Sequence, residues 1–577
     1  MKNRRTCRVL THLVSFLIAF NLSARAASKP GDQADVLRST MQEELQRAQS
    51  SLGQLDPAPY FMSYSVYDQS MAVAVGSEGS LVNSTHTRRR TVDVTMRIGT
   101  AALDNSHQQN RPSARNTGML PLTDDRNAIS RELWRVTYEE YRKASKAYLN
   151  VKTNAQVQAK EEDTSPDFSE EKPITHTDYK EVAPAPDHRA LEKFARDYSA
   201  HFRKYPYIYS SLVVVNAQNT RFHFLSTDGS YIVSPSAYIR VAVEAETRAE
   251  DGMELMRVET FQAESFDHLP PASEIAARVK KMATDLKALR DAPVAEPFDG
   301  PALLSGRASA VFFHEVLGHR LEGHRQRGER EGQTFTKKVG QPVLPEFLSV
   351  TDDPSQRKLN GMDLGGWYEF DDEGMPASRV DVIQNGVLNN FLMSRMPIKN
   401  FAHSNGHGRA QPGAMPTGRQ GNLIVSSTRT VEDSELRQKL IDEVNKQGKP
   451  YGLYFEDIQG GFTLTQRSMP QAFQVLPVLV WRVYPDGRPD ELVRGIDIVG
   501  TPLAAMNRIL VTGKKTEIFN GVCGAESGQL PVAAAAPAML FSEIEVQKRV
   551  HQLNRPPILP SPSDSGTETA KQMGANQ

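Results

Sequence analysis

The sequence predicts an α+β fold built from antiparallel or mixed sheets, and two observations favour it. Segments with helical and with strand periodicity are mixed along the chain, without the strict β–α alternation of a doubly wound fold. Asn385-Gly386 separates two runs of alternating apolar and polar residues, which is the strongest short-range signal for a β-hairpin. Because 577 residues exceed what one hydrophobic core supports, we expect more than one domain. We place an N-terminal α/β domain at residues 27–295 and a β-rich catalytic domain, carrying a metal-binding helix, at residues 296–552.

The N-terminal domain is expected to combine helices with long runs of strand. Residues 33–53 have apolar side chains at helical spacing, and residues 88–98 alternate apolar and polar side chains as a half-buried strand does. Residues 161–187 are acidic and contain prolines, so we expect a connector or a loop that orders on docking rather than core. The other expected elements are strands at 60–66, 71–75 and within 208–261, and helices at 129–160, 188–204 and 272–291.

The second domain is expected to begin after a proline-bearing connector at 292–301, with the metal-binding helix at about 304–325. The predicted hairpin occupies residues 379–392. Residues 403–422 are rich in glycine, arginine and proline, and we expect an irregular surface loop there. The other expected elements are a helix at 433–447, strands at 473–484, 492–499 and 538–550, and a disordered tail at 553–577.

The first 26 residues have the pattern of a secretory signal peptide. Four basic residues precede an apolar run at 9–22, and Ala24-Arg25-Ala26 is typical of a cleavage site. We therefore expect export to the periplasm or the cell exterior, with no stable membrane anchor after cleavage. Cleavage would take the formal net charge from −1 to −6, which gives no support to nucleic-acid binding.

Two histidines flank a glutamate in the stretch His314-Glu315-Val316-Leu317-Gly318-His319. Neutral imidazoles bind zinc, and an adjacent carboxylate can take a proton from a zinc-activated water. In the familiar helical zinc-protease motif the histidines are four residues apart, whereas here they are five apart. Five residues of a regular α-helix turn about 500°, which leaves the two rings about 140° apart. The spacing therefore predicts a bulge or break before the second histidine, at Gly318, with Val316 and Leu317 facing the core.

A third metal ligand is offered by Cys523, the one cysteine that remains after Cys7 leaves with the signal peptide. It has no intrachain disulfide partner, and it lies in what looks like a tight glycine-rich loop. As a thiolate it would complete a His, His, Cys zinc site with one open position for water. The alternative is a buried, inert cysteine, and lone helical histidines are likewise more often core or surface residues than ligands.

Several further segments, taken with the histidine motif, resemble the TldD/PmbA family of zinc peptidases. They are Gly300-Pro301, 368–374, 386–388, 393–395, 404–409, 494–503 and Cys523-Gly524, in that order. The resemblance implies one zinc ion per chain, held by His314, His319 and Cys523, with Glu315 as general base. It also implies dimers, in which the active subunit of some members pairs with a relative lacking the metal motif.

Two features depart from the family, and one loop offers a further candidate site. The best-known members are cytosolic and lack a signal peptide, so the predicted export leaves their substrates in question here. His324 stands where an acidic residue is more familiar, either as a surface residue or as a partner of a metal ligand. His403, His407 and Arg409 lie together in one loop, where they could bind a substrate carboxylate or carbonyl or simply be solvated.

The leading functional hypothesis is a zinc-dependent peptidase that cleaves unfolded proteins or peptides, held as an added β-strand with Glu315 as general base. Two alternatives stay open. One is a non-catalytic partner subunit with a structural zinc, although a structural site closes with four protein ligands and needs no adjacent glutamate. The other is a zinc amidohydrolase acting on cell-wall peptides, which is compatible with export.

Overall fold

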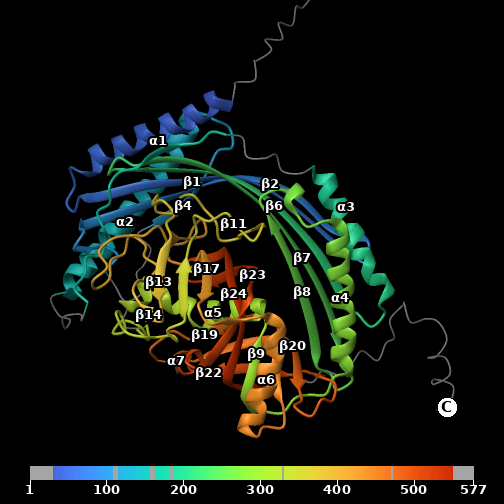
Figure 1. Ribbon diagram of the computed structural model, residues 1–577. Helices are drawn as coiled ribbons and strands as arrows, with labels where there is room; N and C mark the ends of the chain where they lie inside the picture. The colour runs from blue at the N-terminus through green and yellow to red at the C-terminus, as the bar shows by residue number, and fades with distance from the viewer. Residues whose placement is uncertain are drawn as a thin grey trace, which may run out of the picture.

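The computed structural model describes residues 30–107, 115–155, 163–180, 187–327, 331–468 and 472–549, so the predicted signal peptide and the predicted tail lie outside the described residues. Within the described chain, no helix is long and apolar enough to cross a membrane. Two large sheets dominate the structure, and the first arches over the second (Figure 1). The predicted α+β class is confirmed.

The first sheet is mostly antiparallel and has the strand order β3-β2-β1-β6-β7-β5, with β4 paired to β2 and β8 to β7. Its one parallel pair joins β5 to β7, so the sheet is mixed. Its strands are β1 (Pro59–Ser77), β2 (Ser80–Thr100), β3 (Leu103–Asp104), β4 (Arg115–Leu120), β5 (Thr175–Thr177), β6 (Ser210–Ser226), β7 (Tyr231–Arg248) and β8 (Glu254–Ala263).

Four helices cover the outer face of this sheet: α1 (Pro30–Leu52), α2 (Arg126–Ala155), α3 (His188–Ser199) and α4 (Ala272–Asp291). Strand residues point alternately to the two faces. On β1, Met62 and Tyr64 lie in the core under α1 and α2, and Ala72 and Ala74 lie in the core under α3 and α4. The odd-numbered residues of β1 therefore face inward, toward the second domain (Figure 1).

The second sheet has the order β14-β13-β10-β17-β24-β22-β20-β19-β9, with β18 and β23 joined through β24 and β21 through β20. Its strands are β9 (Phe298–Leu304), β10 (Leu348–Asp352), β13 (Val380–Gln384), β14 (Val387–Leu388), β17 (Asn422–Ser427), β18 (Thr430–Val431), β19 (Gly452–Thr463), β20 (Phe473–Val483), β21 (Glu491–Val493), β22 (Ile496–Gly500), β23 (Ile509–Ala525) and β24 (Gly528–Lys548). Two small ribbons, β11 (Lys358–Leu359) with β12 (Met362–Asp363) and β15 (Gly408–Arg409) with β16 (Thr417–Gly418), lie beside it.

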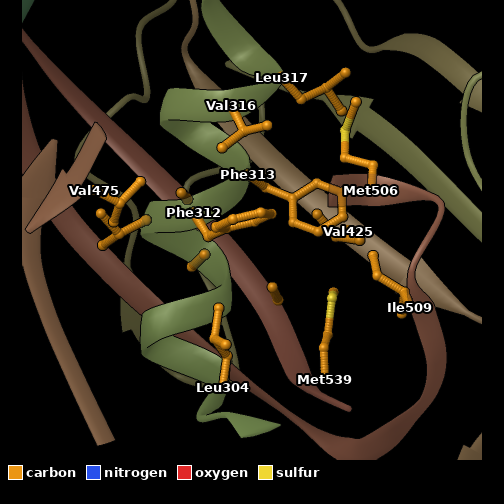
Figure 2. Packing of buried hydrophobic residues seen from close by; sticks show 14 of the residues in the cluster. Leu304, Phe312, Phe313, Val316, Leu317, Val425, Val475, Met506, Ile509 and Met539 are labelled. Carbon is orange, nitrogen blue, oxygen red and sulfur yellow. The ribbon is translucent and has the colours of Figure 1, made fainter. Parts of the chain in front are cut away.

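Helix α5 (Gly306–Val316) packs into the core of this second domain, whose other helices are α6 (Asp433–Gln447) and α7 (Pro502–Met506). Phe312 and Phe313 of α5 are fully buried, and Figure 2 shows them between Val475 on one side and Val425 on the other. Full burial of a phenylalanine side chain contributes about 1.5–3 kcal/mol, so this packing fixes the helix firmly. The residues that follow it are thereby held at a defined place.

Four sequence expectations need correction. The strands expected at 60–66 and 71–75 are one strand, β1, because the residues between them, 67–70, pair with both β2 and β6. Helix α5 stops at Val316 instead of continuing to 325. Phe168, inside the expected connector, is buried against Phe61 with ring centroids 4.8 Å apart, so this segment contributes to the core. Cys523 lies on a long strand, β23, which pairs residue by residue with β24.

Candidate metal centre

The helix that carries the first histidine has a defined start and a defined end. Ser305 begins it, because the Ser305 side chain accepts a hydrogen bond from the Ala308 amide. The α-helix ends at Val316, and a separate 3-10 turn, Gly318–Leu321, contains the second histidine. The predicted break between Glu315 and His319 is confirmed, and Leu317, at the break, is fully buried in the core, as expected.

Gly318 packs tightly against the Gln420 side chain at this break. A Cβ atom there would lie 1.9 Å from the Gln420 side-chain oxygen, so any other residue would require Gln420 to move. The Gln420 amide in turn lies 3.4 Å from the carbonyl oxygen of His314. Close packing against Gln420 therefore accounts for a glycine here. The sequence alone suggested a different reason, namely that glycine allows the helix to distort at little energetic cost.

The break brings together three side chains of the kind that bind metal. Ligand atoms of His314, His319 and Cys523 all lie within 4.8 Å of one another, and all three residues are buried. The Nε2 atom of His319 is 3.4 Å from the sulfur of Cys523. The two imidazole rings are nearly perpendicular, with centroids 5.1 Å apart. Helix α5, the 3-10 turn and strand β23 each contribute one member of this group.

A buried carboxylate and two arginines hold the group in place. His319 uses its Nδ1 atom to contact Glu322, 3.1 Å away, which leaves Nε2 directed at the sulfur. Arg325 donates to Glu322 at 2.7 Å. Arg419 donates to the Cys523 carbonyl oxygen at 3.0 Å, and its Nε lies 3.4 Å from Glu322. Such carboxylate–histidine pairs orient metal ligands in proteins. The sequence did not predict that the carboxylate and the two arginines support the metal ligands, because they lie far apart in sequence or outside the histidine spacing.

Neighbouring charges shift the pKa values of these three side chains in the direction opposite to the effect of burial. Burial alone would lower the pKa of a histidine, but Glu322 and the Cys523 thiolate raise the pKa of His319 to about 10. The same thiolate raises the pKa of His314. Burial would raise the pKa of Cys523, but the two histidines lower it to about 4. The cysteine is therefore a thiolate at neutral pH, the form that binds metal.

A cavity of about 400 Å³ opens beside the three side chains, with Glu315 in its wall. Residues 459–463 of β19 form one side and residues 522–526, around the β23–β24 turn, another. Glu315 packs against Gly461, where a Cβ atom would lie 3.0 Å from the Glu315 Cγ atom. The glutamate therefore lines the same space as the metal-binding atoms, as a general base must.

The other residues singled out from the sequence lie elsewhere. His403 is exposed, with its ring 3.5 Å from Glu171. His407 is fully buried 3.4 Å from Asp352, so the expected surface loop is in part interior. Arg409 is buried and donates to the Gln420 and Pro531 carbonyl oxygens. None of these three is among the residues that line the cavity beside the metal-binding group. His324 contacts Glu526, which lies in the turn between β23 and β24.

The donor set fits a zinc ion. Two imidazoles and one thiolate are borderline and soft ligands, and three protein ligands leave a position open for water, as in catalytic zinc sites. The Nδ1 atom of His314 is buried and has no hydrogen-bond partner among the described residues. A thiolate buried between two histidines likewise calls for a cation, and a metal ion would take the place of the imidazole protons.

Comparison with known proteins shows that the second domain is similar to a family of metallopeptidases. Residues 299–548 match the PmbA/TldA metallopeptidase C-terminal domain. A metalloprotease of Archaeoglobus fulgidus is 25% identical over 239 residues, which cover 41% of this chain and 51% of that protein. A protein of Haemophilus influenzae named metalloprotease TldD homolog is 27% identical over 250 residues, covering 43% of this chain and 48% of that protein. The chain thus spans about half the length of the curated relatives it matches.

Solved structures extend the similarity to most of the chain, at the level of the fold. A protein from Thermotoga maritima superimposes with a TM-score of 0.59 at 15% identity, covering 88% of this chain and 99% of its own. TldE from Thermococcus kodakarensis gives a TM-score of 0.57 at 13% identity, covering 88% of this chain and all of its own. Both chains share the fold of this protein over most of their length.

Proposed function

We propose that the chain is a member of the TldD/PmbA family and a zinc-dependent peptidase that hydrolyses peptide bonds in unfolded proteins or peptides. The observation that carries this proposal is the convergence of His314, His319 and Cys523 on one buried point beside a cavity that also contains Glu315. Relatives named metalloproteases support the same reaction class.

The residues divide the reaction between binding and proton transfer. When bound, zinc would polarise the scissile carbonyl and lower the pKa of water. Glu315 accepts the proton of the attacking water and returns it to the leaving amine. Glu322 holds the ring of His319 through Nδ1, so that Nε2 stays free as a ligand. Arg419 fixes the Cys523 backbone and neutralises part of the charge that the thiolate and Glu322 bring into the interior.

Strand edges beside the cavity favour an extended substrate. β19 pairs with β9 only at Leu453–Phe455, so among the described residues 459–463 have no ladder partner on that edge. β23 pairs on its outer edge with β18 only at Thr512 and Gly513, well before the residues that line the cavity. An extended peptide can add to such an edge through its main chain, largely independent of its side chains. Unfolded chains present such strands, whereas folded proteins do not.

Glu315→Gln tests the proposal. The variant should retain zinc, since the three ligands are unchanged, and lose about 10²–10⁴-fold in kcat on an unfolded protein substrate. Zinc content by elemental analysis and turnover by release of new amino groups would be measured on the same preparation. A Glu315→Gln protein with full turnover would contradict the assignment of the general base.

The two alternatives become outcomes of the same assay. A non-catalytic subunit would bind zinc and leave every peptide intact, whereas a wall amidohydrolase would release peptides from cell-wall fragments and ignore unfolded protein. Among the described residues the metal-binding group has three members, which supports an open site over a closed structural one.

We propose in addition that the chain is exported and acts as a dimer, with itself or with a related subunit. Export rests on the signal-peptide pattern of residues 1–26, and mass spectrometry of native protein should find a first residue near Ala27. Pairing with a relative is supported by the fold shared with TldE. Light scattering of the purified chain, alone and with a co-expressed relative, distinguishes the two kinds of dimer.

A further inference from the structure

A second cavity, of about 440 Å³, lies between the two domains and has no part in the metal centre. Its floor is the inner face of the arched sheet, formed by β1, β6, β7 and β8 (Figure 1). Its roof comes from the second domain: residues 363–372, 409–412 and 529–531. A volume of this size is within the range of small-ligand sites.

The floor of this cavity is polar, although it is the inner face of a sheet. Tyr238 donates to the Gln218 side chain, Gln218 donates to Thr220, and Gln69 donates to the same threonine. The strand register places these residues in neighbouring rows, with Gln69 opposite Thr220 and Gln218 opposite Tyr238. The side-chain oxygen of Asn216 also lies at this floor, buried and without a partner among the described residues. Polar groups withdrawn from water call for hydrogen-bond partners, and a ligand can supply them.

Ion pairs hold several of the charged groups around the cavity, and Arg89 donates a hydrogen bond to the Gln69 side chain. Arg357 lies 3.3 Å from Glu264 and stacks on Trp367 at 3.9 Å. Asp363 lies 3.2 Å from Lys358. Apart from its charged groups, the lining consists chiefly of amides and hydroxyls, which can both donate and accept hydrogen bonds, and of aromatic rings. Peptide groups have the same mixture of one donor and one acceptor.

This cavity adjoins the metal centre across one β-hairpin. Cys523 on β23 is paired with Leu530 on β24, and Leu530 lines the interdomain cavity while Cys523 lines the catalytic one. Adjacent strands are about 4.8 Å apart, so the two cavities lie on either side of the hairpin end. A few extended residues, at about 3.3 Å each, cover a length greater than this strand spacing.

We propose that the interdomain cavity is an exosite that holds the main chain of the substrate several residues away from the cleaved bond. This inference rests on the proposed peptidase function. It assigns to Gln69, Gln218 and Asn216 the recognition of peptide groups, and to Trp367 contact with substrate side chains. Long unfolded chains gain this second contact, whereas short peptides reach only the metal centre.

A cavity-filling substitution tests the exosite. Ser236→Trp places a large ring on an exposed floor position, and Ser210→Trp is the matched control, since Ser210 is exposed on β6 outside the cavity lining. Each variant would be assayed with an unstructured, uncharged peptide of about 14 residues and with a five-residue peptide of about 17 Å containing the same cleaved bond. Ser236→Trp should raise KM for the long peptide about tenfold and leave the short peptide unchanged, and Ser210→Trp should change neither.

Binding without cleavage separates this inference from the proposed function. Anisotropy of the labelled long peptide would be titrated with the Glu315→Gln protein, with and without Ser236→Trp. Weaker binding in the double variant supports the exosite even if the wild-type chain cleaves nothing, in which case the proposed function fails alone. Equal KM values for wild type and Ser236→Trp on long peptides that are cleaved would overturn the exosite and leave the peptidase standing. Displacement of the peptide by a neutral oligosaccharide at lower concentration than by unlabelled peptide would also overturn it.

Discussion

Two histidine-bearing segments of this chain have similar composition and opposite environments. His314 and His319 lie on either side of a helix break, and a thiolate from a distant strand meets them beside a cavity. His403 and His407 lie in one loop, but one is exposed beside Glu171 and the other is buried beside Asp352. Residue type made both segments candidates for a site. What distinguishes them is convergence of several donors on one point that substrate can reach.

The largest effect on zinc binding is expected at the thiolate of Cys523. Cys523→Ser should lower zinc affinity and activity by more than about 100-fold, because the soft, negatively charged ligand is lost. Zinc content after dialysis, measured by elemental analysis, checks this. Val522→Ser, at the exposed neighbouring position, is the control and should keep its zinc. Full zinc occupancy in Cys523→Ser would show that the third ligand lies elsewhere.

The pH dependence of zinc binding gives a second test of the group formed by His314, His319 and Cys523. The pKa of His319 is raised to about 10, so this ring is protonated at neutral pH and zinc must displace its proton. The pKa of Cys523 is lowered to about 4, so the thiolate needs no deprotonation above that pH. Zinc affinity should therefore rise about tenfold per pH unit per displaced proton between about pH 5 and 9. Calorimetry in buffers of different ionisation enthalpy counts the released protons; an affinity independent of pH would be inconsistent with these charges.

A smaller effect is expected one contact away from the ligands. Glu322→Gln removes the charge that raises the His319 pKa and weakens the fixed orientation of the ring. Zinc affinity should fall about 10–100-fold, the range typical of such supporting residues. Competition with a zinc chelator measures it. Glu432→Gln, an exposed ion-pairing residue far along the chain, should behave as wild type. Unchanged affinity in Glu322→Gln would mean that the carboxylate has only a structural role.

The smallest effect is expected in the loop. His403→Ala removes an exposed side chain outside the catalytic cavity, and kcat/KM on unfolded protein should change less than about twofold. His407→Ala leaves a buried gap beside Asp352 and should cost about 1–3 kcal/mol of stability while the zinc content stays at the wild-type level. Thermal unfolding and zinc analysis separate the two effects. A large loss of kcat/KM in His403→Ala would restore the substrate-binding role first considered for this loop.

Local patterns were sufficient for part of this structure. Helices α4 and α6 lie at the residues that apolar spacing predicted, and the five-residue histidine spacing required the break that α5 shows. Asn385 and Gly386 both adopt positive φ, as the hairpin turn needs. Cys523 could be proposed as a ligand because it was the last cysteine available. These inferences depend on spacing within one element or on a count.

Contacts between residues that are distant in sequence could not be predicted from these local patterns. Whether a glycine-rich stretch near Cys523 is a loop or a strand depends on β24, which pairs with it along most of its length. Glu322 and Arg419 acquire their roles only when folding brings them to His319 and Cys523. Gly318 packs against Gln420, which is distant in sequence. Likewise, the polar floor of the interdomain cavity looks in sequence like any half-exposed strand.

X-ray absorption at the zinc edge tests the central claim most directly, since it reports the atoms around the metal. For the wild-type chain loaded with one zinc ion, we expect one sulfur at about 2.3 Å and two imidazole nitrogens at about 2.0–2.1 Å, with a further light atom. The sulfur contribution should vanish in Cys523→Ser. A wild-type spectrum without sulfur, or with only oxygen ligands, would contradict a centre built from His314, His319 and Cys523.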